Sequence, residues 1–206
     1  MRGSLEEFKV ASLLNIFLSS DGALELRGVL GTNLSLTCLR GALRAVTVGS
    51  TPWYDPPMIE ALVTHLLNAE RGSFEVQPQS ARTVKDTNVR PVTRLELPLT
   101  TMIVSAYARM DALQPERAEM DQHQTFRLDD IGLEAGITDP VLRVFLGLAA
   151  PLLKTGSSIV HLHDALGLER QWLCALLQHL RGLRAVRVSA DTGKLEPMEM
   201  QRGLPA

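Results

Sequence analysis

The spacing of apolar residues and glycines in the C-terminal third, residues 138–199, most constrains the fold of this chain. It predicts three successive helices, separated by Gly156 and Gly167. The first begins at Pro140, behind the candidate cap Asp139, because proline is favoured at the first helical position. The third begins at Glu169 and carries four leucines at i, i+3, i+4 and i+7: Leu173, Leu176, Leu177 and Leu180.

A β-hairpin is predicted after the third helix. Val186 and Val188 alternate with polar residues, 190–193 form a turn signal, and 194–196 return as a second strand. The order helix, helix, turn, helix and hairpin resembles a winged helix-turn-helix domain. That resemblance implies contact with either DNA or protein, since a fold by itself does not establish a function.

The composition is typical of a folded soluble protein. Of 206 residues, 45% are hydrophobic and 21% are charged, and the length allows one large or two small domains. Glu6 and Glu7 interrupt any signal-peptide pattern, and no apolar run is long enough to span a bilayer. We therefore expect a cytoplasmic protein without membrane insertion, with Cys38 and Cys174 as free, buried thiols.

Charge divides the chain unevenly. The formal charge is +1 for residues 1–110, −6 for 111–139 and +3 for 140–206, within a net charge of −2. The acidic segment contains a proline and a long polar run, which is typical of a solvated connector. We therefore predict a domain over 1–113, an acidic connector over 114–136 and a domain over 137–206. An acidic segment that shields the basic domain from nucleic acid is the alternative.

The first domain is predicted to be a small antiparallel sheet with helices packed on it, because its strand segments alternate apolar and polar residues. With the winged-helix-like domain, this gives an α+β protein. Arg40–Gly41 is predicted to be a tight turn between two strands. The predicted elements, in order, are a helix with a stripe from Val10 to Leu18, strands around Leu24–Leu26, Leu34–Cys38 and Leu43–Ala45, a helix opened by Pro56–Pro57, a strand at Ser73–Val76 and a helix over Leu99–Leu113.

Several motifs of residues 1–113 resemble the bacterial PATAN-type signalling domain. They are the opening Gly3–Leu5, the turn and strand Asp21–Leu26, the hairpin Leu36–Ala45, the helix-to-strand step Glu70–Val76 and the helix segment Ser105–Asp111. The resemblance implies a signalling domain without catalytic residues that binds protein partners, in some members linked to surface motility or type IV pili. No receiver domain accompanies it in this chain.

The candidate catalytic constellations are poor. His161 and His163 are two residues apart on a predicted helix, so they point to different sides and cannot share a metal ion. The loop 28–31 lacks the lysine and helix start of a phosphate loop. The five histidines are expected at surface or boundary positions. We therefore predict no enzyme activity, no catalytic residue, no metal site and no cofactor.

The hypothesis for partner binding is a patch of Trp53 and Tyr54, with Arg40 and Arg44 from the neighbouring hairpin. The two aromatic residues lie in a proline-flanked segment, 51–57, that the sequence predicts to be a loop. Aromatic and arginine side chains are the commonest binding anchors. The alternative for Trp53 is that its ring folds back onto the core as a lid.

The leading interpretation is a cytoplasmic signalling adaptor that binds a protein partner of unknown identity. Homodimer formation is a further possibility that the sequence leaves open. The alternative is a transcription regulator that binds DNA through the third helix and the wing. Its candidate DNA-binding residues are Arg170, Gln171, Gln178, Arg181, Arg187 and Lys194. The charge of +3 is small for tight DNA binding. The third helix also has a broad apolar face, which predicts packing on the first domain or on a partner chain.

Overall fold

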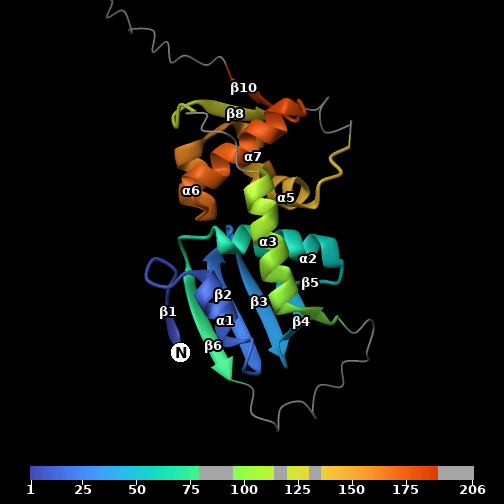
Figure 1. Ribbon diagram of the computed structural model, residues 1–206. Helices are drawn as coiled ribbons and strands as arrows, with labels where there is room; N and C mark the ends of the chain where they lie inside the picture. Colours follow the sequence, from blue (N-terminus) through green and yellow to red (C-terminus); the bar gives the residue numbers. More distant parts are fainter. Residues whose placement is uncertain (79–94, 114–119, 130–135, 190–206) are drawn as a thin grey trace, which may run out of the picture.

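The computed structural model describes residues 1–78, 95–113, 120–129 and 136–189 (Figure 1). Within these residues the protein has six helices and two antiparallel sheets. The fold is therefore α+β, as the sequence predicts.

The larger sheet has seven strands, and its order differs from the order of the chain because β6 inserts between β1 and β2. Strand β4 lies near one edge, where it pairs with β3 on one side and with both β5 and β7 on the other. Across the sheet the strands are β1 (Arg2–Ser4), β6 (Ser73–Pro78), β2 (Gly22–Val29), β3 (Thr32–Leu39), β4 (Ala42–Val48) and β5 (Thr51–Trp53), with β7 (Leu97–Pro98) beside the start of β4.

The predicted tight turn between β3 and β4 is confirmed. Arg40 and Gly41 have φ angles of 53° and 71°, a left-handed pair that suits the twist of a two-residue hairpin. Asp21 Oδ1 accepts a hydrogen bond of 2.6 Å from the Arg40 backbone nitrogen, so the turn is also held by a side chain. A Cβ atom at Gly41 would lie 3.2 Å from the Leu18 carbonyl oxygen.

One face of the larger sheet is buried by helices α1 (Val10–Ile16), α2 (Pro56–Leu67) and α3 (Leu99–Leu113). In Figure 1, α3 crosses this face and α2 lies between the sheet and the C-terminal helices. The alternating residues of the central strands are fully buried on this side, as the sequence predicts: Leu24, Leu26, Leu34, Leu36 and Cys38. The predicted starts of α2 and α3 are confirmed.

The C-terminal part contains the three predicted helices in the predicted order: α5 (Pro140–Thr155), α6 (Ile159–Leu166) and α7 (Arg170–Gly182). Asp139 caps α5, because its Oδ1 accepts hydrogen bonds from the backbone nitrogens of Val141 and Leu142. Gly167 ends α6 in the left-handed conformation, with φ of 67°. These caps account for the boundaries that the sequence indicates.

The smaller sheet corrects the prediction of a solvated connector over 114–136. Its order is β10–β8–β9, with β10 (Val186–Val188), β8 (Thr125–Leu128) and β9 (Ser157–Ser158). Strand β8 lies inside the predicted connector, and its Phe126 is 0% exposed. The prediction is therefore wrong for Thr125–Leu128, because a single buried aromatic ring outweighs the surrounding polar residues. The predicted return strand, 194–196, lies outside the described residues.

The two parts of the described chain share one continuous hydrophobic core. Helix α2 packs against α3 and also against α5. The predicted domain boundaries at 113 and 137 stay predictions, because a shared core does not test whether each part folds alone.

Candidate partner-binding surface

The four residues of the predicted patch lie on neighbouring parts of the larger sheet but line two different hollows. Strand β7 pairs with Ala42 and Leu43, and β5 pairs with β4 from Val46 onward. Arg44 lies between these two pairings. Arg40 therefore lies in the β3–β4 turn and Arg44 on β4, whereas Trp53 ends β5, the edge strand, and Tyr54 follows it.

Trp53 and Tyr54 lie in different environments. Trp53 ends β5, opposite Val46, and is partly buried against the core. The prediction of a loop over 51–57 is therefore wrong for Thr51–Trp53, which pair with β4 in spite of Pro52. Tyr54 is 53% exposed. A hollow of about 240 Å³ is lined by Trp53, Tyr54, Asp55 and Met58.

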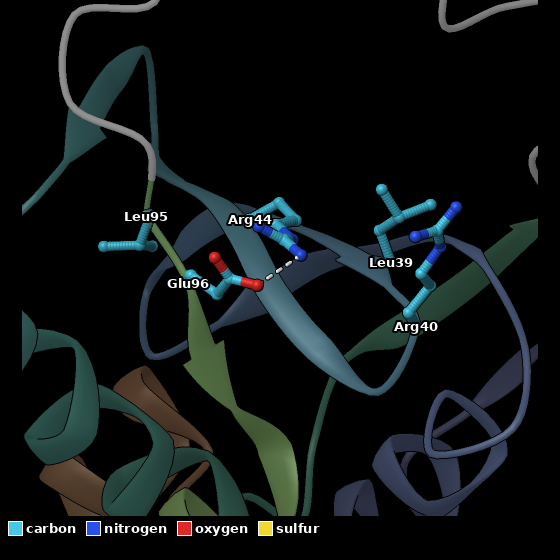
Figure 2. Close-up of a pocket in the computed structure, with 5 residues that line it drawn as sticks. All are labelled: Leu39, Arg40, Arg44, Leu95 and Glu96. Atoms are coloured by element: carbon cyan, nitrogen blue, oxygen red, sulfur yellow. Dashed lines mark hydrogen bonds and ion pairs between the residues drawn. The ribbon is translucent and has the colours of Figure 1, made fainter.

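Arg40 and Arg44 line a second, larger hollow of about 470 Å³, together with Leu39, Leu95 and Glu96 (Figure 2). Arg44 Nη2 donates to Glu96 Oε1 at 2.7 Å. The four predicted patch residues thus line two hollows. The sequence offered no signal for Leu95 or Glu96, because a single carboxylate in a short segment has no periodicity that would indicate its neighbours.

The candidate DNA-binding residues on α7 share one exposed face. Arg170, Gln171 and Arg181 are exposed and Gln178 is partly exposed. Their spacing places them on one side of the helix, opposite its buried residues. Arg187 is exposed on β10, and Lys194 lies outside the described residues.

The beginning of α7 is fixed against the N-terminal part of the chain by backbone hydrogen bonds. The Glu70 nitrogen donates to the Gly167 oxygen at 2.7 Å, and the Glu169 nitrogen donates to the Asn68 oxygen at 2.9 Å. The Leu30 nitrogen donates to the Leu166 oxygen at 3.0 Å. The turn between α6 and α7 is therefore held by two loops of the other part.

A buried histidine joins the two parts at their centre. His65 Nε2 donates to the Val141 carbonyl oxygen at 2.9 Å, and His65 Nδ1 accepts from Trp172 Nε1 at 3.1 Å. Burial lowers the pKa of His65 to about 4, so the ring is neutral at pH 7. The prediction of a surface or boundary position is therefore wrong for His65, which is 0% exposed, and also for the buried His163. The place of His65 between Leu62 and Leu66 on an apolar helix is the signal that indicates burial.

The broad apolar face of α7 packs on the first part, which confirms one of the two predicted outcomes for that face. Trp172 contacts His65 of α2, and His179 Nε2 donates to the carbonyl oxygen of Leu113, the last residue of α3, at 3.2 Å. One helix face therefore completes the core of the C-terminal part and also covers α2 and α3.

Both thiols are at least partly buried, and His161 and His163 each lie within hydrogen-bonding distance of a neighbouring group. Burial raises the pKa of Cys38 to about 12, and burial also raises the pKa of Cys174, which is partly exposed rather than buried. His161 Nδ1 lies 3.0 Å from Ser157 Oγ, and His163 Nδ1 donates to the Leu168 oxygen at 2.7 Å. Within the described ranges, no three metal-ligating side chains gather in a way that could hold an ion.

Comparison of the chain with protein-family models, with curated proteins and with solved structures finds no match. The helices of the described part are too short or too polar to cross a membrane. The functional argument therefore rests on the surfaces of the chain itself.

Proposed function

We propose that the protein is a non-enzymatic cytoplasmic signalling adaptor, with a PATAN-like first part, that binds a protein partner at the β4 edge. The observation that carries the proposal is Tyr54, a large aromatic side chain that stays 53% exposed beside a hollow. An exposed aromatic ring offers much contact area at little entropic cost, because its side chain has few rotatable bonds. Arg40 and Arg44 add the second residue type that is enriched in binding hot spots.

The fixed position of α7 favours protein over DNA as the partner. A recognition helix enters the major groove with its first turn foremost. In this chain that turn follows directly on residues Gly167 and Glu169, which are bonded to the loop at Asn68–Glu70. A duplex that approached Arg170 would therefore also meet the N-terminal part of the protein.

A DNA-binding regulator is the second candidate, with a winged-helix-like C-terminal part. The exposed face of α7, with two arginines and two glutamines, favours it, because these side chains read base edges and phosphates. In the small sheet β10 is an edge strand, because β8 lies between β10 and β9. Arg187 on β10 would then lie beside the duplex backbone.

Cross-linking from a defined side chain tests the adaptor proposal. A photoreactive phenylalanine analogue at Tyr54 should cross-link a specific protein in cells of the native host. The matched control carries the analogue at Phe8, which is similarly exposed and follows β1, the strand at the other edge of the larger sheet. The proposal fails when both positions give the same products. It is replaced by the second candidate when the intact protein retards duplex DNA at moderate salt and Arg181→Ala abolishes that binding.

A further inference from the structure

On one edge of the Arg44 guanidinium group, only one of the two N–H donors has a hydrogen-bond acceptor among the described residues. Its Nη2 donates to Glu96 Oε1, whereas Nε on the same edge is buried and has no acceptor among the described residues. Nε–H and Nη2–H point in parallel and match the two oxygens of one carboxylate. A buried N–H without an acceptor is destabilising, and a second oxygen on this edge would give it a partner.

The ion pair between Glu96 and Arg44 can be displaced by a ligand, because the Glu96 side chain is exposed. That side chain is 63% exposed, whereas that of Arg44 is 24% exposed. An exposed ion pair of this kind contributes little to stability, so a better-fitting ligand can displace Glu96. In Figure 2 the Glu96 carboxylate reaches Arg44 from the segment that precedes β7.

The rest of the hollow fits a carboxylate on a short apolar stem. Leu39 and Leu95 contribute apolar surface to its lining, and Arg40 contributes a second guanidinium group from the β3–β4 turn. In Figure 2 the Arg40 side chain lies beside Leu39, on the side of Arg44 away from Glu96. A volume of about 470 Å³ accommodates side chains of a peptide, with the hollow open to solvent.

We propose that this hollow binds a glutamate or aspartate side chain of an acidic peptide segment, and that Glu96 is an internal competitor for the same edge of Arg44. The proposal rests on the proposed adaptor function and names the chemistry of its partner. Arg44 therefore strengthens binding of the peptide, whereas Glu96 weakens it.

A titration with acetyl-triglutamate amide, followed by ¹H–¹⁵N NMR, tests the proposal. The Arg44 Nε–H cross-peak, identified by its loss in Arg44→Lys, should shift saturably as the peptide is added. Glu96→Gln should tighten binding about two- to fivefold, the worth of an exposed ion pair. Glu7→Gln makes the same change in net charge at another exposed carboxylate and should leave the affinity unchanged.

Three results would overturn the proposal. One is the absence of a saturable Arg44 shift in both the unmodified protein and Glu96→Gln. Another is equal tightening by Glu96→Gln and Glu7→Gln, which would show a general charge effect. The third is equally tight binding of 5′-phosphorylated trithymidylate, which would make the hollow a general anion site. Cross-linking at Tyr54 that persists after any of these results leaves the adaptor function standing with a different partner chemistry.

Discussion

At the scale of single residues, His65 shows how the core accommodates one fully buried polar side chain. Both ring nitrogens are paired, one with the Val141 carbonyl and one with the Trp172 indole. The arrangement works only with a proton on Nε2 and none on Nδ1. Protonation of Nδ1 would remove the acceptor for Trp172 and bury a charge.

The pH dependence of stability should report this histidine. Its pKa falls from 6.5 to about 4 on folding, so the unfolded chain binds the proton more strongly. The stabilisation is complete above about pH 6.5 and is lost as the pH falls towards 4. Urea unfolding of the unmodified protein between pH 7.5 and 4.5 should show this loss, which can reach about 3 kcal/mol.

His65→Leu should have a smaller acid dependence, since leucine does not titrate. His123→Leu, at an exposed histidine, is the control and should follow the unmodified protein. Identical acid slopes for His65→Leu and the unmodified protein would contradict the assignment.

Substitution of the two aromatic residues, Trp53 and Tyr54, should have different effects on partner capture and on stability. Tyr54→Ala should weaken capture of the cross-linked partner by about 2 kcal/mol or more and leave the melting temperature nearly unchanged, because the ring is exposed. Trp53→Ala should lower the melting temperature as well, because its ring is packed against the core. Calorimetry of both variants beside a capture assay measures the two effects. A melting temperature that falls equally in both variants would place Tyr54 in the core.

At the scale of elements, the sequence predicts those whose signal is repeated. The strands β2 and β3 and the helices α2 and α3 each carry several apolar residues at a regular spacing, and all are found. Strand β8 has one buried residue in four, too few for a period to be visible. The Arg44–Glu96 pair was not predictable either, because it joins residues 52 positions apart through a β4–β7 pairing of two residues.

The β3–β4 turn gives a prediction with a paired control. Gly41→Ala should destabilise the protein by about 1–2 kcal/mol, because alanine is strained at φ of 71°. Gly147→Ala should be neutral or stabilising by up to about 1 kcal/mol, because Gly147 is an exposed position inside α5 with open space at its Cβ. Chemical denaturation of the two variants measures both signs. Equal effects would show that the turn does not depend on its backbone conformation.

At the scale of the whole molecule, buried contacts join the two parts, so we do not expect them to behave as independent domains. They combine a hydrogen-bonded histidine, paired loop backbones and the apolar face of α7. Separating the parts would expose Trp172 and leave the Val141 carbonyl without its donor. The loss of buried apolar surface and of these hydrogen bonds makes partial opening unfavourable.

We therefore expect a single cooperative unfolding transition for the whole chain. Guanidinium unfolding of a Trp53→Phe variant, in which fluorescence reports Trp172 alone, should coincide with unfolding followed by far-ultraviolet circular dichroism. Leu24→Ala in β2 and Leu173→Ala in α7 remove fully buried side chains from the two parts and should each cost about 2–5 kcal/mol. In a cooperative molecule both variants shift the same transition, as seen by either probe. Two transitions, with each variant shifting only one of them, would show that the parts unfold independently and that their shared core contributes little to stability.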